Sequence, residues 1–283
     1  MITFSSLGKY GRLGNQLFQY SILKSVSNKT GFEIVLDKDI NTFTWHGQKC
    51  LLNNFNLKSA NYGKSRARNR YSEKTNDLIL SPKIYDENVY KVSDDTNFFG
   101  YFQSPKYYEN IKDILRDELE LNNQYEDFGD EYLNQFSNTT VSLHVRRGDV
   151  SDGTNRGCEW ANDFTPNSIQ YQYYKNALDS IPQDSTILLF TGGNRENKNN
   201  KDYEWCKNNF KDERIVFVSD MNELETISIM KKVDINITGF KSTFSWWGSF
   251  LNKNENVFAP KNFNPTIKYP EDIEIYPSYF KLL

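Results

Sequence analysis

The chain has 283 residues, of which 37% are hydrophobic and 25% charged, so it can build a folded core and is not a disordered chain. Its net charge of −3 excludes the positive field of a general nucleic-acid binder. No run of eighteen apolar residues occurs, and the first residues lack the features of a secretion signal. We therefore expect a cytoplasmic protein. Peripheral contact with the inner face of a membrane carrying a lipid-linked glycan is left open.

The N-terminal segment is predicted to form a β-loop-α-β unit. It begins with a strand at residues 2–4, continues through a glycine-rich turn at 8–14, and enters a helix near Asn15. A strand at residues 33–36 follows. The helix is indicated by apolar residues at i, i+4 and i+8, which are Phe18, Ile22 and Val26.

The middle of the chain has weaker patterns. Between residues 40 and 125 the periodicity is poor, and we expect loops and helices, with one helix over 110–121. Residues 122–130 are rich in Asn, Asp and Gly, which is typical of an inter-domain connection. The sequence thus predicts two domains, residues 1–125 and 126–283.

From residue 140 onward, strands and helices alternate. Strands are predicted at 141–145, 186–191, 215–218, 235–238 and 256–259, and helices at 168–180, 203–209, 222–232 and 243–251. Such alternation favours a parallel sheet with crossover helices. Ligands of open α/β sheets bind at the carboxyl ends of the strands, and two polar motifs fall at such positions.

The first motif ends the strand at 141–145. Four polar side chains lie within six residues around Gly148: His144, Arg146, Arg147 and Asp149. Two adjacent arginines can offer planar, fork-shaped donors to a diphosphate, which suits Arg better than Lys. The same residues would also suit a surface ion-pair cluster, and spacing alone leaves both interpretations open.

The second motif follows the strand at 235–238. It contains Ser242, Thr243, Phe244, Ser245, Trp246, Trp247 and Gly248. Hydroxyl groups at a helix start can cap the helix, and together with its free N–H groups they can bind phosphate oxygens. Ordinary capping above buried tryptophans explains the motif equally well.

The third motif lies in the N-terminal turn and consists of Gly11, Arg12, Leu13, Gly14, Asn15 and Gln16. Its glycines would let the backbone approach a ligand closely before the helix begins. It is not the dinucleotide fingerprint Gly-x-Gly-x-x-Gly, so alone it is weak evidence.

With these three motifs in the chain order 11–16, 144–149 and 242–248, the sequence resembles the α-1,2-fucosyltransferases of glycosyltransferase family 11. Those enzymes combine a Gly-x-x-Gly-Asn-Gln turn, a His-x-Arg-Arg-x-Asp box and a late Ser-Ser/Thr-Phe-Ser-Trp-Trp-Gly segment. The resemblance covers most of the chain, from residue 8 to about residue 262. It implies a GT-B fold of two facing Rossmann-like domains, with acceptor binding in 1–125 and GDP-fucose binding in 126–283.

The resemblance also implies an activity. The enzyme would transfer L-fucose from GDP-β-L-fucose to a glycan hydroxyl, O2 of a galactose by family analogy, with inversion at the sugar carbon and without a metal or other cofactor. Arg146 would then contact the β-phosphate and stabilise the leaving GDP, with Arg147 in support. His144 would orient the box or the nucleotide. The remaining expected donor contacts are Gly11, Arg12, Gly14, Asn15, Ser242, Thr243, Phe244 and Ser245.

Two residues are candidates for the general base that takes the proton from the acceptor hydroxyl. Asp149 lies in the box, and Asp152 follows in a glycine-containing loop. Either carboxylate would fail as a base if it served only as the ionised partner of an arginine.

Two rival functions remain open at this point. Asp37 and Asp39 follow a predicted strand and could hold a metal ion beneath a diphosphate, as in a metal-dependent GT-A transferase. In such a transferase a nucleotide-binding unit comes before the aspartates, and too few residues precede Asp37 to form one. We therefore interpret Asp37 and Asp39 as part of a turn. The other rival is a non-catalytic glycan-binding protein that stacks sugars on Trp45, Trp160, Trp246 and Trp247, although aromatic residues more often form cores.

Overall fold

The computed structural model describes the chain from Met1 to Leu283 except for residues 46–47, 65, 74–82, 156, 193–200 and 271–272. Contacts divide the chain into two units. Unit 1 contains Met1–Gln124 and Tyr269–Pro277, and unit 2 contains Tyr125–Lys268 and Ser278–Leu283. The sequence had suggested a single division after residue 125, without this return of the chain to unit 1 near its end.

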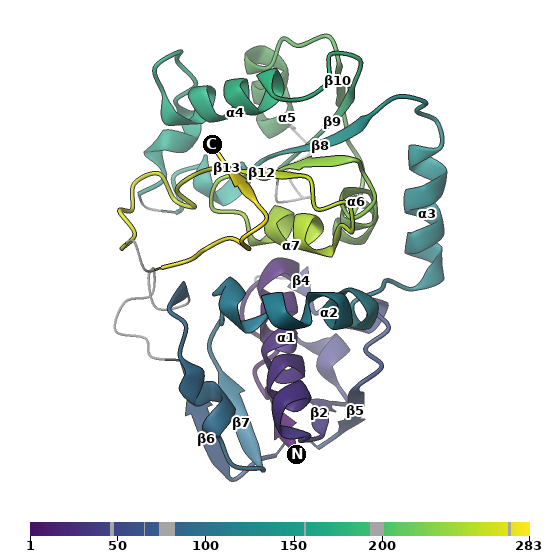
Figure 1. Ribbon diagram of the computed structural model, residues 1–283, viewed down its shortest axis with the longest axis vertical. Coiled ribbons are helices and arrows are strands. Elements are labelled where there is room, and N and C mark those ends of the chain that lie inside the picture. Colours follow the sequence, from purple (N-terminus) through teal and green to yellow (C-terminus); the bar gives the residue numbers. More distant parts are fainter. Residues whose placement is uncertain (46–47, 65, 74–82, 156, 193–200, 271–272) are drawn as a thin grey trace. The chain divides into compact units, whose positions relative to one another are not determined.

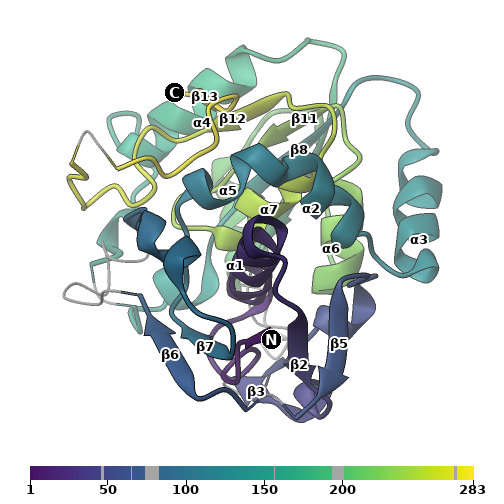
Figure 2. The ribbon, with the colours of Figure 1, turned by 60° about the horizontal axis from the view of Figure 1, so that its bottom comes forward.

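Unit 1 is built on a five-stranded sheet whose paired strands are all parallel. The sheet order is β5-β2-β1-β7-β6, formed by Ala60–Gly63, Ile34–Asp37, Ile2–Thr3, Thr96–Phe99 and Asn69–Ser72 (Figure 1). Helix α1, Leu13–Thr30, connects β1 to β2 and packs against both strands. Figure 2 shows α1 beside the sheet that contains β2 and β5. The predicted apolar face of α1 is confirmed, since Phe18, Ile22 and Val26 are buried.

The expectation of loops and helices over residues 40–125 is wrong in part, because three of the five sheet strands lie there. Strands β5 and β6 have four residues each and carry exposed polar side chains such as Asn61 and Arg70, so they lack the alternation that marks a strand. The described chain also forms a short hairpin of β3, Thr44–Trp45, and β4, Gln48–Lys49, and helix α2, Lys112–Glu118.

Unit 2 contains the parallel sheet that the sequence predicted. Its order is β10-β9-β8-β11-β12-β13, formed by Ile215–Phe217, Thr186–Thr191, Thr140–Val145, Ile235–Ile237, Val257–Ala259 and Lys281–Leu282. Five of these strands lie within two residues of their predicted bounds, and β13 was not predicted.

Helices cover both faces of this sheet. They are α3, Asn123–Leu133; α4, Ile169–Asp179; α5, Lys201–Asn209; α6, Glu223–Met230; and α7, Thr243–Leu251. In β9, Ile187 and Leu189 join one buried cluster with residues of α4 and α5, while Leu188 and Phe190 join another with residues of α6. Strand β9 is therefore buried on both faces, which matches the continuous apolar run at its centre.

The two units divide between Gln124 and Tyr125, inside the connection predicted at residues 122–130, but this segment forms helix α3 rather than the turns that its composition suggests. Phe128 and Tyr132, one turn apart, pack against the apolar cluster of α6 and β9. A side chain at Gly129 would meet the backbone oxygen of Ser228 at 2.7 Å, so this glycine permits close contact between α3 and α6. Tertiary packing therefore overrides a composition typical of turns. Within the described ranges, no helix is long and apolar enough to span a bilayer.

Candidate active site

The box and the second motif meet at one edge of the unit 2 sheet. Strand β8 is buried along its whole length and pairs with β9 on one side and β11 on the other. Because the strands are parallel, β8 and β11 both end at the same edge. Arg146 directly follows β8, and the turn from Thr238 to Ser242 leads from β11 into α7. This is the edge where open parallel sheets bind ligands.

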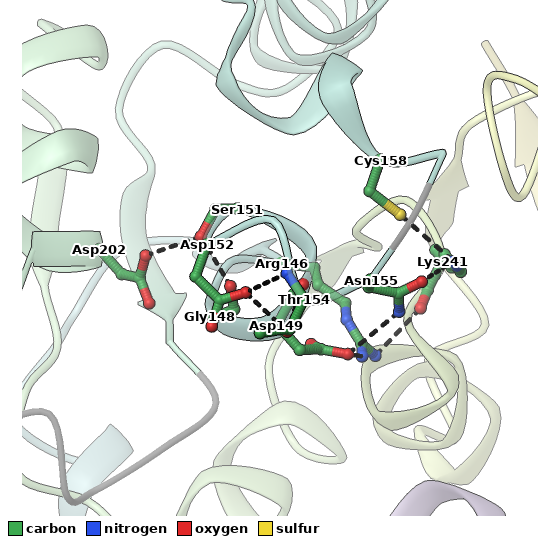
Figure 3. Close-up of polar contacts among 10 residues, drawn as sticks. All are labelled: Arg146, Gly148, Asp149, Ser151, Asp152, Thr154, Asn155, Cys158, Asp202 and Lys241. Atoms are coloured by element: carbon green, nitrogen blue, oxygen red, sulfur yellow. Dashed lines mark hydrogen bonds and ion pairs between the residues drawn. The ribbon is translucent and has the colours of Figure 1, made fainter.

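A closed ring of polar contacts forms at this edge (Figure 3). One terminal nitrogen of Arg146 donates to both carboxylate oxygens of Asp149 at 3.0 and 3.2 Å, and the other donates to the backbone oxygen of Lys241 at 3.1 Å. Asn155 donates to Asp149 at 3.2 Å and accepts from Nζ of Lys241 at 2.9 Å. The ring thus fixes the Arg146 guanidinium, whose side chain remains 25% exposed.

Arg147 points away from this ring into unit 2. Its guanidinium donates to Asn162 at 3.0 Å, to the backbone oxygen of Ala161 and to Asp202 at 3.4 Å, and it stacks on the Trp205 ring at 3.9 Å. Burial lowers the pKa of Arg147, and the neighbouring Asp202 acts in the opposite direction. Of the two adjacent arginines, Arg146 is therefore the more exposed, with 25% of its side chain accessible against 6% for Arg147.

His144 lies buried behind the ring. Its imidazole contacts the Phe244 ring, with centroids 6.0 Å apart, and its backbone oxygen accepts from the Tyr174 hydroxyl at 2.9 Å. Nδ1 is buried and has no hydrogen-bond partner among the described residues. Burial, assisted by the charge of Arg146, lowers the pKa of His144 to about 3. The imidazole is therefore neutral near pH 7 and connects the box to the second motif by packing.

The backbone of the second motif fits closely against His144. A Cβ atom at Gly239 would lie 2.7 Å from both Nδ1 and the backbone oxygen of His144. Helix α7 then begins after Ser242, whose hydroxyl accepts from the Ser245 N–H at 3.1 Å, while the Ser245 hydroxyl accepts from the Gly239 N–H at 3.1 Å. Both serine hydroxyls thus shape the turn. Thr243 and Phe244 are partly exposed at the first turn.

Both candidate bases, Asp149 and Asp152, accept hydrogen bonds from neighbouring residues. Asp149 is held by Arg146 and Asn155 as described above. Asp152 is exposed and accepts from the backbone N–H and the hydroxyl of Thr154, at 2.9 and 2.7 Å, so it closes a local turn in the loop (Figure 3). Both carboxylates thus already have hydrogen-bond donors as partners.

The third motif belongs to unit 1. Gly11 has a left-handed φ of 87°, and a side chain there would meet Cβ of Asn15 at 2.6 Å. Arg12 precedes α1, Gly14 is buried in its first turn, and Asn15 accepts from Gln103 at 3.0 Å. The helix begins at Leu13, slightly earlier than predicted. Gly11 therefore permits a tight turn into the start of α1.

Comparison with known proteins assigns the chain to a family. It matches Glycosyl transferase family 11 over residues 6–272, nearly its whole length. The chain belongs to this family. This confirms the resemblance found in the three motifs, and the protein is a family 11 glycosyltransferase.

Two curated relatives come from Escherichia coli. The O-antigen biosynthesis glycosyltransferase WbnK is 26% identical over 180 residues, which cover 58% of this chain and 54% of WbnK. The match thus spans about half the length of WbnK. An alpha-1,2-colitosyltransferase is 22% identical over 280 residues, which cover 85% of each chain.

Solved structures show the fold. The fucosyltransferase NodZ from Bradyrhizobium aligns with a TM-score of 0.56 at 11% identity, covering 88% of this chain and 92% of NodZ. POFUT1 in complex with GDP aligns with a TM-score of 0.51 at 12% identity, covering 88% and 93%. Together with the two parallel α/β units, these similarities show the predicted GT-B fold of the family 11 enzyme.

Sequence reasoning missed two members of the polar ring, Asn155 and Lys241. Lys241 lies directly before the second motif, but a single lysine in a turn carries no signal of its own. Its contact with Asn155 joins residues 86 positions apart. The left-handed φ of 51° at Lys241 was also invisible in the sequence.

The described residues of the two rival sites do not take the predicted form. Asp37 ends β2 and accepts from the Asp39 backbone N–H at 3.0 Å, which is the turn that the sequence favoured. In the described part of the chain, no group of three His, Cys, Asp or Glu side chains is placed to hold a metal ion. Trp160, Trp246 and Trp247 are buried and offer no sugar platform, while the side chain of Trp45 lies outside the described residues.

Proposed function

We propose that this family 11 glycosyltransferase transfers L-fucose from GDP-β-L-fucose to O2 of a galactose in a glycan acceptor. The observation that carries the proposal is the fixed, partly exposed guanidinium of Arg146 at the carboxyl edge of the unit 2 sheet. The donor is supported by the fold of POFUT1 in complex with GDP-fucose, which aligns with a TM-score of 0.51. Glycan synthesis is supported by the relative named for O-antigen biosynthesis.

In the proposed reaction, the acceptor oxygen attacks the sugar carbon and GDP departs with growing negative charge on its β-phosphate. Arg146 stabilises that charge, and its contacts to Asp149 and Lys241 hold it in place before the reaction. The first turn of α7 adds N–H groups and the Thr243 hydroxyl, and its helix dipole favours an anion. A preorganised positive site of this kind requires no metal, and we propose that none takes part.

We assign the other predicted residues supporting roles. Arg147 braces the segment that follows β8 through Ala161, Asn162 and Trp205. His144 orients the box through its packing on Phe244. In unit 1, we propose that the turn at Gly11, Arg12, Gly14 and Asn15 also contacts the donor.

The acceptor hydroxyl must transfer its proton to a general base, and Asp149 and Asp152 remain the candidates. Asp149 is the ionised partner of Arg146, and a carboxylate stabilised in this way is a weaker base. We therefore propose that Asp149 serves mainly to orient Arg146.

Sugar transfer can be tested directly by measuring GDP release. The enzyme is incubated with GDP-fucose and a galactose-terminated oligosaccharide in the presence of EDTA, and the product linkage is determined by NMR. We expect GDP release and an α-1,2 linkage with the wild type and almost no release with Arg146→Ala. Stabilisation of the fold by UDP but not by GDP would overturn the proposal.

A second donor deserves a parallel assay because one relative, over 85% of this chain, is named a colitosyltransferase. Colitosyl transfer would use the same diphosphate contacts and differ only at the sugar. Turnover with a GDP-linked colitose at a higher kcat/KM than with GDP-fucose would replace fucose in the proposal and leave the role of Arg146 unchanged.

A further inference from the structure

Lys241 is a positive charge in the polar ring, and no acidic side chain of the described residues is paired with it. Its Nζ contacts the amide oxygen of Asn155 at 2.9 Å and Sγ of Cys158 at 3.2 Å (Figure 3). Arg146, by contrast, is paired with Asp149. Burying part of a cation costs free energy when no negative charge is nearby to offset the lost hydration. An anion bound beside Lys241 would therefore stabilise this site.

The position of Lys241 places this charge beside the other phosphate-binding elements of unit 2. Its backbone oxygen accepts from Arg146 at 3.1 Å, and the next residue, Ser242, is the N-cap of α7. The positive end of the α7 dipole adds to the two cations. Lysine is held here in the left-handed region with φ 51°, a conformation that it rarely adopts, so its placement is imposed by the surrounding structure.

We propose that Lys241 is a second cationic ligand of the donor diphosphate and shares the charge of the leaving GDP with Arg146. Its Nζ exchanges the Asn155 amide and the Cys158 sulfur for phosphate oxygens when the donor binds. A flexible ammonium suits this role because it can move between partners, whereas Arg146 is fixed by several contacts. The inference rests on the proposed function, since it assigns a further residue to the same donor site.

Loss of the Lys241 ammonium should weaken binding of GDP, which carries the diphosphate, but not of guanosine, which lacks it. In Lys241→Met, the Kd for GDP rises about tenfold to a hundredfold, as expected for removal of a hydrogen bond to a charged group, while the Kd for guanosine changes less than twofold. Lys241→Arg restores GDP affinity to within about threefold because it keeps the charge. Lys253→Met, which removes an exposed lysine just after α7, is the matched control and leaves both constants unchanged.

Isothermal titration of the four proteins with GDP and guanosine provides the test, with circular dichroism and Tm to verify folding. Lys241→Gln serves in place of Lys241→Met if the latter does not fold. Equal weakening of GDP and guanosine, or unchanged GDP affinity, would overturn the inference and leave the proposed function intact. A wild-type enzyme that bound no GDP would instead count against the proposed function itself.

Discussion

Arg146 and Asp149 form a pair in which one guanidinium nitrogen donates to both carboxylate oxygens, at 3.0 and 3.2 Å. The second terminal nitrogen of Arg146 is held by the Lys241 backbone, so the cation is oriented from two sides. In the proposed function Arg146 meets the diphosphate, while both carboxylate oxygens of Asp149 are engaged in holding Arg146.

Arg146→Lys tests the need for this fixed guanidinium. Lysine keeps the charge but cannot contact Asp149 and the Lys241 backbone from two nitrogens in one plane. We expect kcat to fall by about 10²-fold, as when one preorganised donor to a developing charge is lost. Steady-state kinetics with saturating donor measure this effect. Retention of more than about a third of the wild-type kcat would mean that charge alone is sufficient.

Asp149→Asn distinguishes an orienting partner from a general base. The amide keeps the size of the side chain and can still accept one hydrogen bond from Arg146. If Asp149 only orients Arg146, we expect kcat to fall by about tenfold. A general base would contribute about 10²–10⁴-fold. Asp152→Asn, measured in parallel, tests the second candidate, and a loss above 10³-fold in either variant would identify the base.

Much of unit 2 was predictable because its central strands β8, β9, β11 and β12 are buried on both faces and alternate with helices along the chain. Unit 1 was harder, since β5 and β6 are short and expose polar residues such as Asn61 and Arg70. Helix α3 was missed because only its contacts with α6, at Gly129 and Phe128, reveal that a turn-like composition is folded as a helix.

The candidate-site residues that could be predicted are those that lie close together in the sequence. Arg146 and Asp149 stand three residues apart and could be paired from the sequence. Lys241 could not be assigned to the site from the sequence, because its backbone oxygen accepts from Arg146, a residue 95 positions earlier in the chain. The different directions of Arg146 and Arg147 were equally hidden, since they depend on the position of Trp205 and Asp202 in α5.

His144 should make stability depend on pH. Burial lowers its pKa from 6.5 to about 3, so between these values the unfolded chain binds a proton that the folded chain does not. The stability due to this group is therefore fully present above pH 6.5 and is lost as the pH falls toward 3, by at most about 1.4 kcal/mol per pH unit. His144→Gln removes this contribution. Urea unfolding at pH 7.5, 6 and 5 should show a smaller loss of stability on acidification in the variant, and parallel pH profiles would contradict the prediction.

Gly239→Ala should disrupt the contact between the second motif and the box. The added Cβ would lie 2.7 Å from two atoms of His144, and neither the backbone oxygen nor the packed imidazole can move freely. We expect unfolding free energy to fall by about 1–3 kcal/mol, as in other overpacked sites, together with a lower kcat. Gly63→Ala is the control because its Cβ would meet only Val35, at an ordinary 3.6 Å. Equal Tm values for the two variants would show that the turn adapts.

Arg147→Met tests whether the second arginine of the box supports the fold rather than the donor. Methionine can keep apolar contact with Trp205 but leaves Asp202 and the Ala161 carbonyl without their guanidinium partner. Loss of one member of a buried pair typically costs about 3–5 kcal/mol, and the 15% exposure of the Asp202 side chain should reduce this toward the lower end. We expect a clear fall in Tm, measured by calorimetry, and a GDP Kd within about threefold of wild type in the folded protein below that Tm. A variant with normal Tm and weak GDP binding would instead place Arg147 on the diphosphate, as the sequence first suggested.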